Sequence, residues 1–147
     1  MNFKEYLIET QKVANEEKEI LDFLSQKETL SPIELRAAKN SLQVIIENAI
    51  GKLKRILKHY NCPIIPQRSK DALNFLYDVG AIDDELYKSL NGAIGFRNSM
   101  IHDYMKFNEE ILYKILQTRA YLDIYNFLID EANYKEVIIQ RIENFSL

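Results

Sequence analysis

One stretch of the sequence decides the fold: SPIELRAAKNSLQVIIENAIGKLKRILKH, residues 31–59. Ser31 can cap free backbone N–H groups, Pro32 suits the first helical position because its missing N–H is not needed there, and Glu34 completes a capping box. Apolar residues then return every three or four positions, which is the period of one helix face. They are Leu35, Ala38, Leu42, Ile45, Ala49, Leu53 and Ile56. The pattern predicts a long amphipathic helix that ends before NCPIIPQ, residues 61–67, since the prolines of that segment disfavour helix.

Helical periodicity also dominates the rest of the chain, and strand signals are absent. Further helices are expected over residues 3–24 and over residues 69–79, with a stop at Gly80. Two more are expected after these, one that Asp83 or Asp84 can cap and one that starts at Asn108. Short connections make neighbouring helices run in opposite directions, so the sequence predicts an all-α fold, an antiparallel up-and-down bundle of about five helices. Residues 1–147 are expected to form one domain, with residues 134–147 as either a short terminal helix or a flexible tail.

The composition is that of an ordinary soluble protein, with 47% hydrophobic and 28% charged residues. Cys62 is the only cysteine, so we expect neither a disulfide nor a metal site, and no cofactor. The absence of a secretory signal and of a long apolar run favours a cytoplasmic protein outside the membrane. The net charge of −3 argues against indiscriminate nucleic-acid binding. The segment KLKRILKH, residues 52–59, is either a local basic site or a set of solvated cations at a helix end.

The stretch GFRNSMIHDYM, residues 95–105, places a charge on an apolar helix face. Leu86, Leu90 and Ala93 step by four and three along the fourth expected helix, and the next position of that stripe is Arg97. A charge there is costly unless it is paired or faces a partner or a wet cleft. Arg97 therefore indicates a subunit interface or a pocket. The alternative is an arginine that extends its apolar stem along the edge of the bundle.

The spacing of the neighbouring polar residues raises a geometric question. On a straight helix Arg97 and Tyr104 would lie nearly in line, roughly 10 Å apart, whereas His102 would point about 140° away from Arg97. Either the helix ends or tightens near residues 101–103, or a second copy of the chain supplies part of the site. Taken alone, His102 could simply be a cation at a helix C-terminus.

Arg97, Asn98, His102 and Tyr104 form the pattern Arg-polar, a few residues, His, one residue, Tyr. This pattern resembles that of the HEPN superfamily, specifically the HepT toxins. Three segments resemble the family in order and spacing: LRAAKNSLQVIIENAI, DALNFLYDVGAIDDELYKSLNGAIGFRN and HDYMKFNEEILYKIL. The resemblance covers roughly residues 34–130. The departures are mainly surface residues, the basic GKLKR after Ile50 and both chain ends.

The resemblance implies a HEPN-like bundle and a toxin that is a metal-independent endoribonuclease. Arg97 would grip a phosphate and stabilise the charge of the transition state. His102 would remove the proton of a ribose 2′-hydroxyl or return one to the leaving 5′-oxygen, and Asn98 would bond the phosphate or hold Arg97. The products would be a 2′,3′-cyclic phosphate and a 5′-hydroxyl. Because one histidine provides either the acid or the base, a homodimer or higher homo-oligomer is expected.

The resemblance also implies a partner, an MntA-type nucleotidyltransferase antitoxin that adds AMP to Tyr104. The alternative for Tyr104 is a residue that only packs against the next helix. A second function class stays open, a non-catalytic binding subunit associated with a nucleotidyltransferase. The presence of Arg97, His102 and Tyr104 together favours the ribonuclease, because an adaptor has no need of a phosphate grip beside a titratable base.

Overall fold

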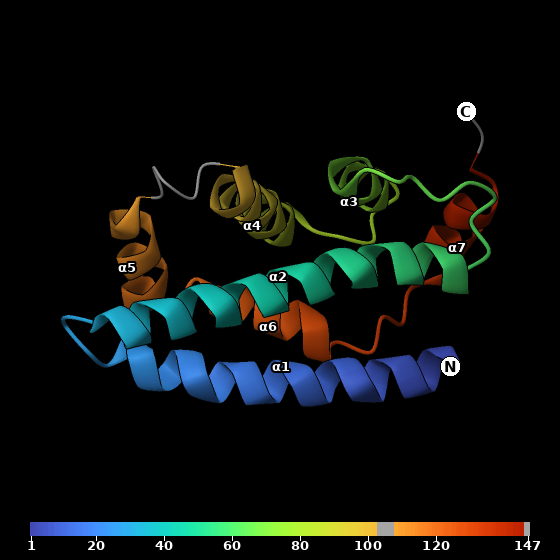
Figure 1. Ribbon diagram of the computed structural model, residues 1–147. Helices are drawn as coiled ribbons and strands as arrows, with labels where there is room; N and C mark the ends of the chain where they lie inside the picture. The colour runs from blue at the N-terminus through green and yellow to red at the C-terminus, as the bar shows by residue number, and fades with distance from the viewer. Residues whose placement is uncertain (103–107, 146–147) are drawn as a thin grey trace.

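The computed structural model describes residues 1–102 and 108–145 (Figure 1). Regular structure within these residues is entirely helical: α1 (Phe3–Ser25), α2 (Pro32–His59), α3 (Ser69–Asp78), α4 (Asp84–His102), α5 (Glu109–Thr118), α6 (Tyr121–Ile129) and α7 (Glu136–Glu143). The all-α prediction is confirmed, with seven helices in the described part of the chain instead of about five. None of these helices is long and apolar enough to cross a membrane.

Helix α2 is the centre of the fold and begins as its sequence predicts. The Ser31 side chain accepts the Glu34 backbone N–H at 3.2 Å, and the Glu34 carboxylate accepts the Ser31 backbone N–H at 2.9 Å. Caps of this kind contribute about 1 kcal/mol. All but one residue of the predicted stripe are buried, the exception being the half-buried Leu35. Helix α2 contacts α1, α3, α4 and α6, so it fixes where α4 lies.

The helices are arranged around α2 on two sides (Figure 1). Helices α1 and α2 lie side by side and run in opposite directions, with α6 packed against both. Helices α3 and α4 lie on the other side of α2 and are seen nearly end-on, so they cross over α2 instead of running along it. Helix α4 therefore lies on the side of α2 opposite α1.

The single helix expected from Asn108 onward is divided into α5 and α6. Helix α5 starts at Asn108 as predicted, and the Asn108 side chain caps it by accepting the Glu110 backbone N–H. The helix then stops at Arg119, which adopts a left-handed conformation with φ of 55°. Neither glycine nor proline marks this break, so the expected length was wrong. The break lets Tyr121 bury its ring and donate a hydrogen bond to Asp22 on α1 at 2.6 Å.

The chain reversal before α4 follows the predicted signals. Gly80 has a φ of 90°, a conformation that L side chains rarely adopt and glycine tolerates. Of the two aspartates considered as caps, Asp83 accepts the Leu86 backbone N–H at 2.8 Å. For residues 134–147, where a helix and a tail were both open, the described part contains α7. Its Arg141 donates to the Val79 carbonyl at 3.2 Å, which ties α7 to the end of α3.

The basic segment 52–59 is used by the fold and is not simply a set of solvated cations. Lys52 is fully buried, and its Nζ donates to the carbonyl oxygens of Phe127 at 2.6 Å, Leu128 at 3.3 Å and Asp130 at 2.5 Å. These carbonyls end α6, where backbone acceptors lack helical partners and a cation is favoured. His59, the last residue of this segment, is exposed and stacks on Phe3 with ring centroids 3.9 Å apart.

Candidate active site

Arg97 lies near the C-terminal end of α4 and is paired across to α2. Its Nε donates to Glu47 Oε1 at 2.6 Å. The Arg97 side chain is 28% exposed and that of Glu47 is 40% exposed, so the pair lies at the protein surface with one side toward the bundle. Arg97 comes directly after the buried Phe96, which fixes the backbone at this point. The pairing explains how a guanidinium occupies an apolar stripe.

Sequence reasoning missed Glu47. Beyond the first turn of α2 it is the only carboxylate in a helix that otherwise carries lysines and arginines. It also lies between Ile46 and Ile50, which are both buried, so it stands at the border of the apolar face. Two features of the sequence could have predicted the pair: Glu47 is an isolated acid in a basic helix, and Arg97 is a cation on an apolar stripe that needs a partner. The distance of fifty residues between the two partners hid it.

Asn98 contributes a second contact to the guanidinium. The Asn98 Oδ1 accepts a hydrogen bond from Arg97 Nη1 at 3.1 Å, and the Asn98 side chain is exposed. Among the residues that the structure describes, the hydrogen bonds of Arg97 engage Nε and Nη1, and none uses Nη2. Since a guanidinium carries five N–H donors, this arrangement leaves donors for an anionic ligand.

His102 is the last residue of α4 and is exposed. Because α4 is helical through His102, the side chains of Arg97 and His102 leave the helix about 140° apart. The structure therefore brings Arg97 together with Asn98 and Glu47, and one chain alone does not bring His102 to the same side. Tyr104, the remaining predicted site residue, lies outside the described residues.

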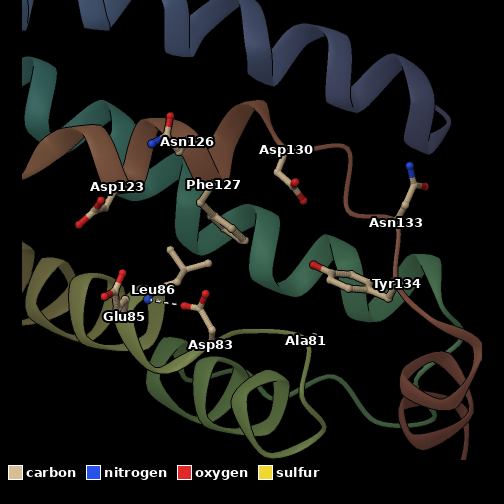
Figure 2. A pocket seen from close by; sticks show the side chains of 10 residues that line it. All are labelled: Ala81, Asp83, Glu85, Leu86, Asp123, Asn126, Phe127, Asp130, Asn133 and Tyr134. Carbon is tan, nitrogen blue, oxygen red and sulfur yellow. Dashed lines mark hydrogen bonds between the residues drawn. The ribbon is translucent and has the colours of Figure 1, made fainter.

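A separate cavity lies at the opposite end of α4 and has a different character (Figure 2). It has a volume of about 410 Å³ and carries four carboxylates, those of Asp83, Glu85, Asp123 and Asp130. Glu85 and Arg97 are twelve positions apart on α4, roughly 18 Å along the helix axis. Such a cluster repels phosphate groups, so the cavity is not the place for the predicted RNA chemistry. No group of three or more potential metal ligands is placed to hold a metal ion within residues 1–102 and 108–145.

Comparisons with known proteins agree with this fold. A solved complex of a tri-AMPylated HEPN toxin of Shewanella oneidensis with its MNT antitoxin contains a chain 21% identical to this one, covering 87% of this chain and 96% of that chain, with a TM-score of 0.75. A toxin–antitoxin complex with AMP-PNP gives 20% identity, coverage of 94% and 99%, and a TM-score of 0.74. At these identities the two structures show that the fold is shared. No curated protein matches.

A family model described as "Ribonuclease HepT-like" matches residues 6–130. The matched part begins within α1 and ends just after α6, so it includes α2, α4 and the whole segment from Arg97 to Tyr104. The match covers most of the chain, and the chain belongs to the HepT-like ribonuclease family.

Proposed function

We propose that the protein is the toxin of a toxin–antitoxin pair and acts as a metal-independent endoribonuclease through Arg97 and His102. The observation that carries the proposal is the guanidinium of Arg97, held at Nε by Glu47 and at Nη1 by Asn98 in a chain of the HepT-like family. Two contacts fix its direction while donors stay available for a phosphate. Such a fixed donor group stabilises developing negative charge better than a mobile one.

The reaction is an internal transfer of the RNA phosphodiester. The ribose 2′-oxygen bonds to phosphorus as a base takes the proton of the 2′-hydroxyl, and the bond from phosphorus to the 5′-oxygen breaks as an acid returns a proton to that oxygen. The products are a 2′,3′-cyclic phosphate and a 5′-hydroxyl. His102 supplies one of the two proton transfers, and Arg97 stabilises the charge on the phosphoryl oxygens.

The direction of His102 supports a homodimer as the active form. One chain has one histidine in the motif, and this histidine leaves α4 about 140° from Arg97. A twofold axis near the end of α4 brings a second Arg97 and a second His102 to the same region, so acid and base come from different chains. Light scattering is expected to give at least a dimer at micromolar concentration, and a monomer would contradict the assignment.

Control is proposed to come from a nucleotidyltransferase antitoxin that adds AMP to Tyr104. The solved HEPN toxin that is similar in fold is tri-AMPylated and bound to an MNT antitoxin. Tyr104 is two residues beyond His102 in the sequence. Each AMP group would bring a bulky, negatively charged phosphodiester near Arg97, where it would pair with the guanidinium and exclude the RNA phosphate.

The decisive experiment is cleavage of a labelled RNA by the purified chain in excess EDTA. We expect fragments with a 2′,3′-cyclic phosphate, identified by their resistance to phosphatase until the ring is opened with acid. Cleavage that stops in EDTA and returns with an added metal ion would contradict the proposal. RNA that stays intact while the chain binds a nucleotidyltransferase would favour the non-catalytic binding subunit instead.

A further inference from the structure

We propose that Glu47 is a positioning residue for Arg97, one that fixes which edge of the guanidinium meets the RNA phosphate. The inference rests on the proposed ribonuclease function and adds a residue outside the Arg97–Tyr104 motif. Its basis is the 2.6 Å hydrogen bond from Arg97 Nε to Glu47 Oε1. This bond joins α2 to α4 near the C-terminal end of α4.

Glu47 is well suited to act as a fixed point. It belongs to the helix that contacts four others, and its neighbours Ile46 and Ile50 are 3% and 7% exposed. The buried neighbours prevent the backbone at Glu47 from shifting. Arg97, by contrast, has a long side chain with several rotatable bonds, and without an anchor its guanidinium would sample many positions.

The donors left by Glu47 decide how an anion can bind. A guanidinium can present to an oxyanion either the edge of Nε and one terminal nitrogen, or the outer edge formed by Nη1 and Nη2. Glu47 occupies Nε, so the outer edge is the one available to a phosphate. Asn98 accepts one hydrogen bond from Nη1, which leaves the second hydrogen of Nη1 and both hydrogens of Nη2 as donors for the phosphate.

The Glu47 carboxylate also adds negative charge beside the site, and this charge affects KM and kcat differently. The charge weakens the attraction of RNA to the free enzyme, whereas the fixed orientation matters most when charge builds up on the phosphoryl oxygens. Removal of Glu47 is therefore expected to lower kcat and to leave KM unchanged or lower. If Glu47 instead competed with RNA for Arg97, its removal would raise kcat/KM.

The test compares Glu47→Ala and Glu47→Gln with the wild type in steady-state RNA cleavage. We expect kcat to fall at least about tenfold in Glu47→Ala, with KM no higher than in the wild type. Glu47→Gln keeps an oxygen that can accept from Nε and is expected to recover part of the loss. Thermal melts should be nearly unchanged, because a partly exposed ion pair contributes little to folding.

Glu19→Gln is the matched control for net charge. Glu19 is exposed on α1, and α1 lies on the opposite side of α2 from α4 (Figure 1). This variant should retain the wild-type kcat. The NMR signal of the Arg97 Nε–H, assigned with Arg97→Lys, gives a readout without RNA. It should show slow solvent exchange in the wild type and fast exchange in Glu47→Ala.

The outcomes separate the two proposals. A wild-type chain that leaves RNA intact contradicts the proposed function, and the role of Glu47 is then overturned with it. A wild type that cleaves RNA, together with a Glu47→Ala variant of equal or higher kcat, overturns only the role of Glu47. Equal solvent-exchange rates of the Arg97 Nε–H in the wild type and in Glu47→Ala would likewise overturn only the role of Glu47.

Discussion

Lys52 and Arg97 are both cations within largely apolar helix faces, yet the fold satisfies them to different extents. Lys52 on α2 is fully buried, and three carbonyl oxygens surround its ammonium group. Arg97 on α4 is partly exposed and has one carboxylate and one amide oxygen as described partners. An ammonium with three acceptors has no donor left, whereas the guanidinium keeps several. The comparison separates a cation that belongs to folding from one that is available to a ligand.

The largest expected effect is on catalysis at the α4 end. Arg97→Ala and His102→Ala should each reduce kcat/KM for RNA at least about 100-fold, or about 3 kcal/mol in the barrier, while the helical circular dichroism is retained. Lys88→Ala, which removes an exposed cation from the same helix, is the control and should keep most of the activity. Undiminished cleavage by His102→Ala would show that the proton-transfer assignment is wrong.

Modification of Tyr104 by the partner should reduce RNA cleavage nearly as much as these substitutions do. Co-expression with the nucleotidyltransferase in the presence of ATP should add the mass of one or more AMP groups to the peptide that carries Tyr104, with loss of cleavage. Tyr104→Phe should escape modification and stay active. Tyr77→Phe, at a tyrosine that is 36% exposed, should still be modified at Tyr104. Neutralised toxin without an adduct would point to inhibition by binding alone.

Substitution of Lys52 at the contact between α2 and α6 should change the stability of the protein and not its RNA cleavage. Lys52→Met leaves the three carbonyl oxygens without their donor, and we expect the free energy of unfolding to fall by about 3 kcal/mol. Urea unfolding followed by circular dichroism measures this loss. Lys58→Met, at an exposed position of the same helix, should change stability by less than about 0.5 kcal/mol. Equal stability of the two variants would mean that Lys52 is not a structural cation.

The comparison also shows what the sequence could reveal and what it could not. The capping box at Ser31, the stop at Gly80 and the cap at Asp83 depend on contacts within a few residues, and each is found as expected. The sequence did indicate the burial of Lys52. This residue comes three positions after Ala49 and four before Ile56, which both belong to the predicted apolar stripe. The same rule that singled out Arg97 therefore applied to Lys52.

Other features depend on partners that are remote in the sequence, and periodicity does not identify them. The pairing of Glu47 with Arg97 is set by how α4 crosses α2, a relation that an apolar stripe does not encode. The division between α5 and α6 arises because burying Tyr121 against α1 outweighs the modest cost of a left-handed Arg119. The helical character of the chain and several of its caps were thus readable locally, whereas the break between α5 and α6, the crossing of helices and the pairing of side chains required the three-dimensional structure.

The smallest expected effect is the dependence of stability on pH through Lys52. Burial lowers the pKa of Lys52 from 10.5 to about 8, and the nearby Asp130 carboxylate only partly offsets this. In the unfolded chain the lysine keeps its ordinary pKa. Between pH 8 and 10.5 the unfolded state therefore binds more protons than the folded state, and the contribution of Lys52 to stability increases with pH.

Other groups titrate in the same range with the opposite sign, so the variant is needed to isolate Lys52. Burial raises the pKa of Tyr121 to about 12, and burial also raises the pKa of Tyr134 and of the Cys62 thiol. These groups keep their protons in the folded state, which lowers stability as the pH rises through their unfolded pKa values. Their effects cancel when the wild type is compared with Lys52→Met at each pH.

The stability advantage of the wild type over Lys52→Met should grow by about 1–2 kcal/mol between pH 8 and pH 10 in urea unfolding. A constant advantage would mean that the three carbonyl oxygens keep Lys52 charged throughout this range, because they stabilise the ammonium form as strongly as burial disfavours it.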